Sequence, residues 1–253
     1  MNLFTLTDHD AIEGSERLRH HPNFFLSEEL TCKLPSGTEI HVGVYDITER
    51  QHAHLVQRRN DILALLMYLT EKRIFFSVNH VFSSVTGRRE LEDFLWFKDY
   101  FPAVEIKNSH MLERANTDAA RLAEQWGKIG IGGSDAHALP SVGTAYTEVP
   151  GACDKNEFFE GLRNGQGRVA GESGCFTKLT RDVYVIAYEM MREKMWTRLL
   201  SPLAILIPGF TYWNYCSERM FTRQWAPQIL DQQETKKPLR WISEPQLMVE
   251  EFL

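Results

Sequence analysis

The sequence has few cysteines, and no two of them lie close together in the chain. The four are Cys32, Cys153, Cys175 and Cys216, and none belongs to a Cys-x-x-Cys spacing. This pattern argues against a zinc knuckle and against a disulfide framework, and it favours a reducing, cytoplasmic setting.

Blocks of like charge are also missing. The 253 residues carry a formal net charge of -6, and no basic run is present. A nucleic-acid backbone attracts a basic surface, so nucleic acid is not expected as a partner. A small-molecule substrate is favoured instead.

Long apolar runs are absent as well. The N-terminal stretch MNLFTLTDHD has neither a basic region nor an apolar core, so it is not expected to be a secretory signal. The run LLSPLAILIPGFTYW, residues 199–213, has 15 residues and two prolines, whereas a membrane-spanning helix needs about 20 apolar residues. Basic residues precede this run and aromatic residues follow it. It suits either a helical cap packed on the protein body, which we favour, or weak contact with a membrane surface.

What is present, from Asn2 to about Val149, is an alternation of short β-branched or aromatic runs with longer segments of helical periodicity. This alternation is typical of an α/β domain. We expect strands in LFTLTDH, EIHVGVYDI, IFFSVNH, AVEIKNS and IGIGGSDAH. The expected helices are Ile12 to His21, Glu49 to Leu69 with Thr48 as the N-cap, Arg88 to Tyr100, and Met111 to Trp126.

The chain changes character after a glycine-rich middle segment. NEFFEGLRNGQGRVAGESG predicts a short helix from Asn156 followed by a boundary. The residues beyond it are helical and rich in aromatics, and a more polar tail runs to Leu253. We therefore expect one domain over residues 1–175 and a helical C-terminal extension over residues 176–253.

Side chains that can bind metal end four of the five expected strands. The carboxyl ends of parallel strands meet at one mouth of a barrel, so these residues are expected to form a polynuclear metal centre. Imidazole and carboxylate together favour Zn, Mn or Fe over Mg or Ca. The residues are Asp8 with His9, His80, Glu105, and Asp135 with His137.

Three of these strand ends resemble motifs of the PHP (polymerase and histidinol phosphatase) superfamily of metal-dependent phosphoesterases. LTDHDAIEG is similar to its second motif, FSVNHVF to its third-motif histidine, and GGSDAHA to its closing motif. Val81 stands where the family usually has Pro. The resemblance covers about residues 3–138 and implies a distorted (β/α)7 barrel that hydrolyses a small phosphate ester.

The same resemblance implies two or three divalent metals, Zn, Mn or Fe, and a set of ligands for them. It assigns one metal to His9 and His137, a second metal to His41 and His80, a bridging role to Glu29, and a further ligand to Asp135. Glu28 is an alternative to Glu29, and His41 lies within a strand, where half of all positions face away from a given site.

The resemblance also implies the chemistry. A hydroxide bridging two metals attacks phosphorus, with Asp135 and His137 as the catalytic residues that position it. Supporting residues orient a ligand or face the substrate. They are Asp8, Glu105, Asn108 and Arg88, with Arg89 and Lys107 as further candidates to bind the phosphate.

One family motif has no counterpart. The first motif is a His-x-His on the first strand, and nothing ahead of Leu3 carries it. His52 and His54 form the chain's own His-x-His, but they begin an expected helix, on which residues two apart point in different directions. We therefore expect a barrel that is incomplete at its N-terminus, through truncation or as a true short form, with an exposed strand edge that favours a homo-oligomer.

Two functions remain open from the sequence. The first, which we favour, is a metal-dependent phosphoesterase. The second is a degenerate PHP domain without activity that serves as a structural or regulatory module. A role at a membrane surface through the C-terminal segment is a third hypothesis.

Overall fold

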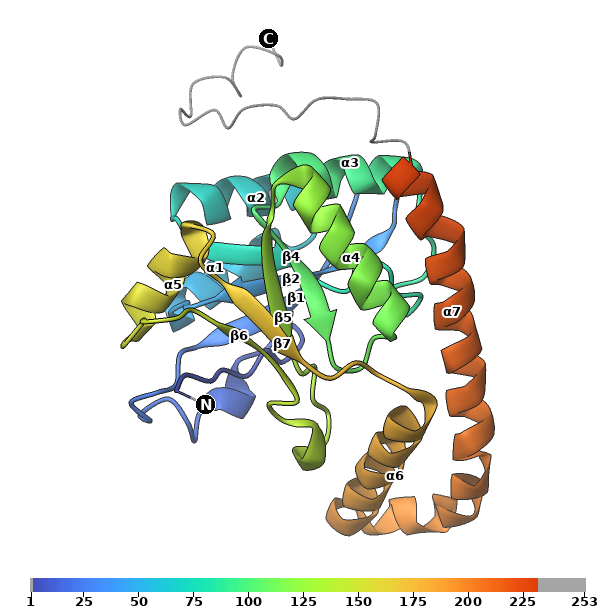
Figure 1. Ribbon diagram of the computed structural model, residues 1–253. Helices are drawn as coiled ribbons and strands as arrows, with labels where there is room; N and C mark the ends of the chain where they lie inside the picture. Colours follow the sequence, from blue (N-terminus) through green and yellow to red (C-terminus); the bar gives the residue numbers. More distant parts are fainter. Residues whose placement is uncertain (1, 232–253) are drawn as a thin grey trace.

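The computed structural model of the protein describes residues 2–231, and its centre is a five-stranded sheet (Figure 1). Strand β2 pairs antiparallel with β1 and with β3, whereas β3, β4 and β5 run parallel. The strands, in their order across the sheet, are β1 (Ser27–Lys33), β2 (Glu39–Tyr45), β3 (Phe75–Val78), β4 (Ala103–Asn108) and β5 (Ile129–Gly133). The α/β class is confirmed. The sheet is mixed and open, and residues 2–231 form no closed barrel.

A second sheet of two antiparallel strands lies beside β5. Strand β6 (Ala145–Glu148) pairs with β7 (Arg168–Gly171), and helix α5 (Lys155–Arg163) connects them. The Thr147 hydroxyl contacts both the amide and the carbonyl of Gly132, at 2.8 and 2.9 Å, which joins β6 to β5. The expected helix from Asn156 is confirmed, but the glycine-rich chain after it contains a strand that the sequence did not predict.

The helix expected over Glu49 to Leu69 is two helices, α1 (Glu49–Arg58) and α2 (Ile62–Glu71). Thr48 caps α1 as expected, in a capping box with Gln51. The break occurs because Asp61 adopts an extended backbone and its carboxylate accepts a hydrogen bond from the Ala64 amide at 3.1 Å. Such a side chain offers the backbone an alternative to continuing the helix. The helices expected over Arg88 to Tyr100 and Met111 to Trp126 are present as α3 (Leu91–Tyr100) and α4 (Glu113–Trp126).

The N-terminal expectations are wrong in detail. LFTLTDH is not a regular strand, because its strand-type pairing among the described residues consists of two isolated parallel bridges, Phe4 to Phe24 and His9 to Glu29. Asp10, at φ 53°, turns the backbone away directly after the second bridge. The helix expected over Ile12 to His21 is reduced to the short 3-10 helix η1 (Glu13–Ser15) followed by turns.

The main core lies between the sheet and the helices and extends to the end of the C-terminal helix. Phe82, Phe94 and Phe97 are buried there, and the Phe94 ring lies 6.0 Å from that of Trp225. Trp225 belongs to α7 (Ile207–Asp231), which runs beside α4 and buries Ala226 and Ile229 in the same core.

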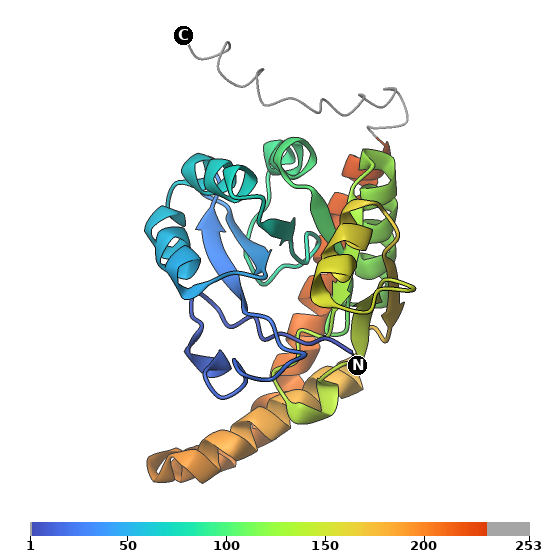
Figure 2. The same cartoon turned by 90° about the vertical axis from the view of Figure 1, so that its left-hand side faces the viewer.

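The rest of the C-terminal region is made by α6 (Phe176–Glu193) and the 3-10 helix η3 (Met195–Leu206). Both views show these two elements extending beyond the body of the molecule (Figures 1 and 2). The last part of the expected extension, residues 232–253, lies outside the described residues.

Candidate metal centre

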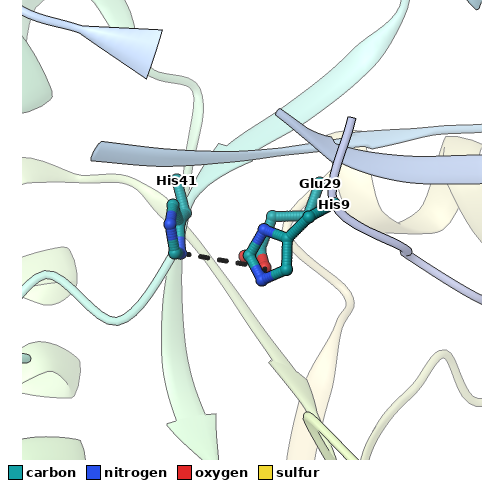
Figure 3. A group of neighbouring side chains, drawn as sticks. All are labelled: His9, Glu29 and His41. Atoms are coloured by element: carbon teal, nitrogen blue, oxygen red, sulfur yellow. Dashed lines mark ion pairs between the residues drawn. The ribbon is translucent and has the colours of Figure 1, made fainter. Parts of the chain in front are cut away.

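Three side chains from three separate segments meet beside β1 (Figure 3). His9 comes from the N-terminal segment, Glu29 from β1 and His41 from β2. Glu29 Oε2 lies 3.4 Å from His9 Nε2 and 3.8 Å from His41 Nδ1. The three potential ligand atoms all lie within 4.8 Å of one another.

The alternation of side chains along β1 decides which of its two glutamates reaches this cluster. Successive residues of a strand face opposite sides. Glu29 faces His9 and His41, whereas Glu28 faces α1 and contacts His52 Nδ1 through Oε2 at 2.8 Å. Glu28 is thus fully buried on the other side of the strand. It does not share the cluster, and neither does His52.

The pairing of β1 with β2 explains why His41 faces the same side as Glu29. In the antiparallel register Thr31 lies opposite His41, and Glu29 lies opposite Gly43. Residues two apart on a strand share a face, so His41 is the diagonal neighbour of Glu29. Gly43 leaves space for the Tyr45 hydroxyl and the Ser77 hydroxyl, which lie where a Cβ would be.

His80 extends the cluster toward β4. Its Nε2 lies 2.7 Å from His41 Nδ1, and its Nδ1 lies 3.3 Å from Glu105 Oε2. The His80 amide also donates to Glu105 Oε2 at 2.9 Å. His80 has φ 31°, a left-handed backbone that is uncommon for a residue other than glycine and is typical of functional sites.

The two neighbouring imidazoles have opposite protonation preferences. Burial lowers the pKa of His41 to about 3, and the adjacent His80 and His9 add to this effect. Burial also opposes the charged form of His80, but the hydrogen bond to Glu105 and the charge of Glu29 outweigh it and raise the pKa of His80 to about 9. The 2.7 Å contact between the two rings therefore joins an imidazole whose pKa is raised to one whose pKa is lowered.

Asn108 connects this region to the closing motif. Its amide nitrogen donates to both oxygens of Glu105 at 3.2 Å and to Asp135 Oδ2 at 3.0 Å. Asp135 also has a left-handed backbone, at φ 47°. Glu105 and Asn108 are both buried, and they link His80 to Asp135.

The remaining expected residues lie apart from the three-residue cluster. His137 is exposed, and its Nδ1 contacts the carbonyl of Asp135 at 2.9 Å. Asp8 is exposed and packs against Gly14, and Arg88 is exposed. Lys107 pairs with Glu113 at 3.0 Å. Arg89 is buried and donates to the carbonyl of Glu39 and the hydroxyl of Thr86.

The sequence did not single out the chain of buried polar groups behind Glu29. Asn79 donates to Glu29 Oε1 at 2.7 Å, and the Ser77 hydroxyl donates to Asn79 Oδ1 at 2.6 Å. The Tyr45 hydroxyl lies 3.2 Å from the Ser77 hydroxyl. Asn79 precedes His80 in FSVNHVF. Its position at the end of a strand, beside a candidate ligand, was the feature of the sequence that could have identified it.

The donor set fits a divalent transition metal. Two imidazoles and a carboxylate are ligands of Zn, Mn and Fe. Tetrahedral bonds of about 2.0–2.1 Å place neighbouring ligand atoms about 3.3 Å apart. The 3.4 and 3.8 Å separations around Glu29 Oε2 are close to that value. A second oxygen of Glu29 is fixed by Asn79, as is common for carboxylates that bind metal.

Comparisons with known proteins found one family model and several solved structures. A family model for PHP-associated sequences (PHP_C) matches residues 113–166. A solved two-domain protein from Bacteroides vulgatus, described as containing a predicted PHP-like metal-dependent phosphoesterase, has a TM-score of 0.50 at 14% identity. The match covers 68% of this chain and 56% of that protein. It shows a shared fold.

Two further solved structures were found. PsfC from Pseudomonas syringae has a TM-score of 0.47 at 18% identity, covering 62% of this chain and 73% of that one. A protein from Bifidobacterium adolescentis, described as a candidate metal-dependent phosphoesterase, has a TM-score of 0.39 at 12% identity, covering 65% and 86%. Comparison with curated proteins gave no match.

The fold and the site together define an α/β protein with a histidine and carboxylate centre. The family model matches one segment of the chain, residues 113–166, and the Bacteroides protein shares its fold.

Proposed function

We propose that this protein hydrolyses a small phosphate ester with the help of divalent metal ions. The observation that carries the proposal is the cluster of His9, Glu29 and His41, whose ligand atoms lie within 4.8 Å of one another beside buried polar groups. The metal-dependent phosphoesterase domain named for the Bacteroides protein supports the same class of reaction.

Each residue has a part in the proposal. His9, Glu29 and His41 hold one ion. His80, Asp135 and His137 provide the further ligands of the centre. Asn79 orients Glu29, and Asn108 orients Asp135. Bound Zn, Mn or Fe supplies Lewis acidity toward the phosphate and a water activated near neutral pH. No serine or cysteine nucleophile is needed.

Several finer features belong to the proposal as well. We propose that the sheet is part of a distorted PHP barrel and that residues 1–175 form the phosphoesterase domain. The substrate is a small molecule, because the net charge of -6 does not suit a nucleic-acid backbone. A reducing compartment is supported by the cysteines, all of which are free.

The test is metal content by elemental analysis together with hydrolysis of p-nitrophenyl phosphate in added Mn²⁺ or Zn²⁺. We expect bound metal and turnover in the wild type, and loss of both in Glu29→Gln. The matched control is Glu28→Gln, which changes the neighbouring buried glutamate on the opposite face of β1. Equal metal content in both variants and the wild type would remove the basis of the proposal.

A degenerate PHP domain is the second candidate, and one observation favours it. His137 is exposed and contacts the backbone of Asp135 rather than the three-residue cluster. A site that holds one ion without His137 can stabilise the fold without turning over substrate. Metal bound through Glu29 with no hydrolysis of p-nitrophenyl phosphate would support this second function.

A further inference from the structure

Helix α6, the 3-10 helix η3 and the first residues of α7, Phe176 to Trp213, form a helical arm that extends beyond the body of the molecule (Figures 1 and 2). The arm is unusually apolar on its outside. Among the described residues, 11 of the 22 large apolar side chains that are exposed lie between Met190 and Trp213. Leu199 and Ile205 are 84% and 81% exposed.

The inside of the arm is polar, so its polarity is inverted. Thr197 and Thr211 are 3% and 1% exposed. The Thr211 hydroxyl lies 2.7 Å from that of Thr180 on α6, and the Thr197 hydroxyl donates to the Met190 carbonyl at 2.9 Å. A helix pair in water normally buries its apolar face. Here the hydroxyls of Thr197 and Thr211 are buried, whereas the leucines between residues 199 and 206, Ile205 and the two tryptophans are exposed.

The helical cap that the sequence favoured is therefore wrong for residues 199–213. Only the later part of α7 packs on the body, through Phe221, Ala226 and Ile229. The run LLSPLAILIPGFTYW forms η3 and the first turns of α7, and most of its apolar side chains are exposed.

Charge distinguishes the kinds of partner that fit this surface. The chain as a whole is acidic, with a net charge of -6, but no acidic residue occurs between Lys194 and Ser217. Lys194 and Arg198 are exposed on this part of the arm, whereas Arg192, next to the exposed Glu193, pairs with Glu189 at 3.0 Å. Two copies joined arm to arm would bring like charges together. An anionic surface would instead pair with them.

Aromatic residues add a second feature. Trp196 and Trp213 are exposed, as are Phe210 and Tyr212. Tryptophan and tyrosine are enriched where apolar and aqueous regions meet at a membrane. Within the part of the chain that the structure describes, no helix combines the length and apolarity needed to cross a bilayer.

We propose that the outer surface of the helical arm lies on the surface of an anionic lipid bilayer. The leucines, isoleucine and aromatic rings enter the region between the headgroups and the acyl chains, and Lys194 and Arg198 contact the lipid phosphates. This interaction does not depend on the metal centre.

The test uses the full chain and sedimentation with vesicles of phosphatidylcholine, with and without phosphatidylserine. We expect binding to the mixed vesicles, a blue shift of tryptophan fluorescence, and weaker binding at raised salt. Leu199→Ser should weaken binding about tenfold, because the favourable transfer of the leucine side chain from water into the bilayer is lost. Leu139→Ser is the matched control, since Leu139 is 89% exposed but lies outside the arm, and it should bind as the wild type does.

Three outcomes would overturn the proposal. One is the absence of binding to either vesicle. Another is equal binding by Leu199→Ser, Leu139→Ser and the wild type. The third is a concentration-dependent dimer, detected by sedimentation velocity and removed by Leu199→Ser, in protein that does not bind vesicles. That result would assign the surface to a second copy of the chain. Circular dichroism checks that each variant is folded.

Discussion

His110 Nε2 lies 2.9 Å from Asp182 Oδ2, and this contact joins the loop after β4 to helix α6. The other ring nitrogen, Nδ1, lies 3.0 Å from the carbonyl of Ser134, the residue before Asp135. One imidazole therefore connects the base of the helical arm to the loop that carries the closing motif. Asp182 is buried, and it also accepts a hydrogen bond from the Ser141 hydroxyl.

Replacing Asp182 by Ala should destabilise the protein. His110 and Ser141 would lose their shared acceptor in a buried setting, which costs about 2–3 kcal/mol. Urea denaturation measures this loss. Glu189→Ala on the same helix is the control, because Glu189 is exposed and pairs with the exposed Arg192. This substitution should change the unfolding free energy by less than about 0.5 kcal/mol. Similar effects of the two substitutions would contradict the structural role of Asp182.

Asn79→Ala should weaken metal binding without removing a ligand. The substitution frees Glu29 Oε1, to which Asn79 donates at 2.7 Å. Loss of a partner that orients a ligand typically lowers metal affinity about 10–100-fold. Isothermal titration with Mn²⁺ or Zn²⁺ measures the change. Asn156→Ala, at an exposed position of α5, should leave the affinity unchanged, and an unchanged affinity in Asn79→Ala would count against the assigned role of Asn79.

Glu218 predicts a pH dependence of stability. This buried carboxyl on α7 accepts hydrogen bonds from the Ser84 hydroxyl at 2.7 Å and the Ser84 amide at 3.0 Å. Burial raises its pKa above 4.5, and the hydrogen bonds to Ser84 only partly offset this. The folded state therefore holds this proton more tightly than the unfolded state, so its contribution to stability is present below the unfolded pKa and is lost as pH rises through the folded pKa.

Glu218→Gln removes this titration. The stability of the wild type relative to the variant should be greatest in acid and should fall as pH rises from 4.5 toward neutrality. Denaturation curves of both proteins at a series of pH values provide the comparison. The prediction is wrong if the stability of the wild type relative to Glu218→Gln stays constant with pH or increases as pH rises.

Two glycines should respond to alanine in opposite ways. A Cβ at Gly174 would lie 2.2 Å from the His110 carbonyl oxygen, so the backbone must shift and Gly174→Ala should cost at least about 1 kcal/mol. Gly209 lies in α7, where a Cβ meets nothing within 4 Å. Gly209→Ala should therefore stabilise the protein by up to about 1 kcal/mol. Thermal melting of both variants tests the pair, and a stabilising Gly174→Ala would refute the close approach.

Local patterns were enough to predict most elements. The alternation of apolar runs located β2 to β5, and Thr48 was identified as a cap because its signal lies within four residues of sequence. β1 was missed because SEELTCK is polar for a strand, and its two neighbouring glutamates are buried on opposite faces with partners that come from elsewhere. The carboxylate of Asp61 divided a helix that periodicity alone made continuous.

The candidate site depended more on tertiary structure. The motifs identified His9, Glu29 and His41 as candidate ligands. The choice between Glu28 and Glu29 depended on which side of β1 each one faces, and the pairing with β2 and the contact of Glu28 with α1 establish this. The exposed position of His137 follows from the left-handed turn at Asp135, which no residue type in GGSDAHA specifies. Its assignment as a ligand remains a prediction, as do the supporting roles of Asp8 and Arg88.

The way His9 reaches the cluster has a consequence for the order of the N-terminal segment. That segment is joined to its neighbours by two isolated bridges, one of which is at His9 itself. An ion bound by His9, Glu29 and His41 would cross-link this segment to the sheet. Metal binding and the ordering of the segment are then coupled equilibria, so each one favours the other. The rate at which a protease cleaves within residues 2–9 would then fall as the free metal concentration rises.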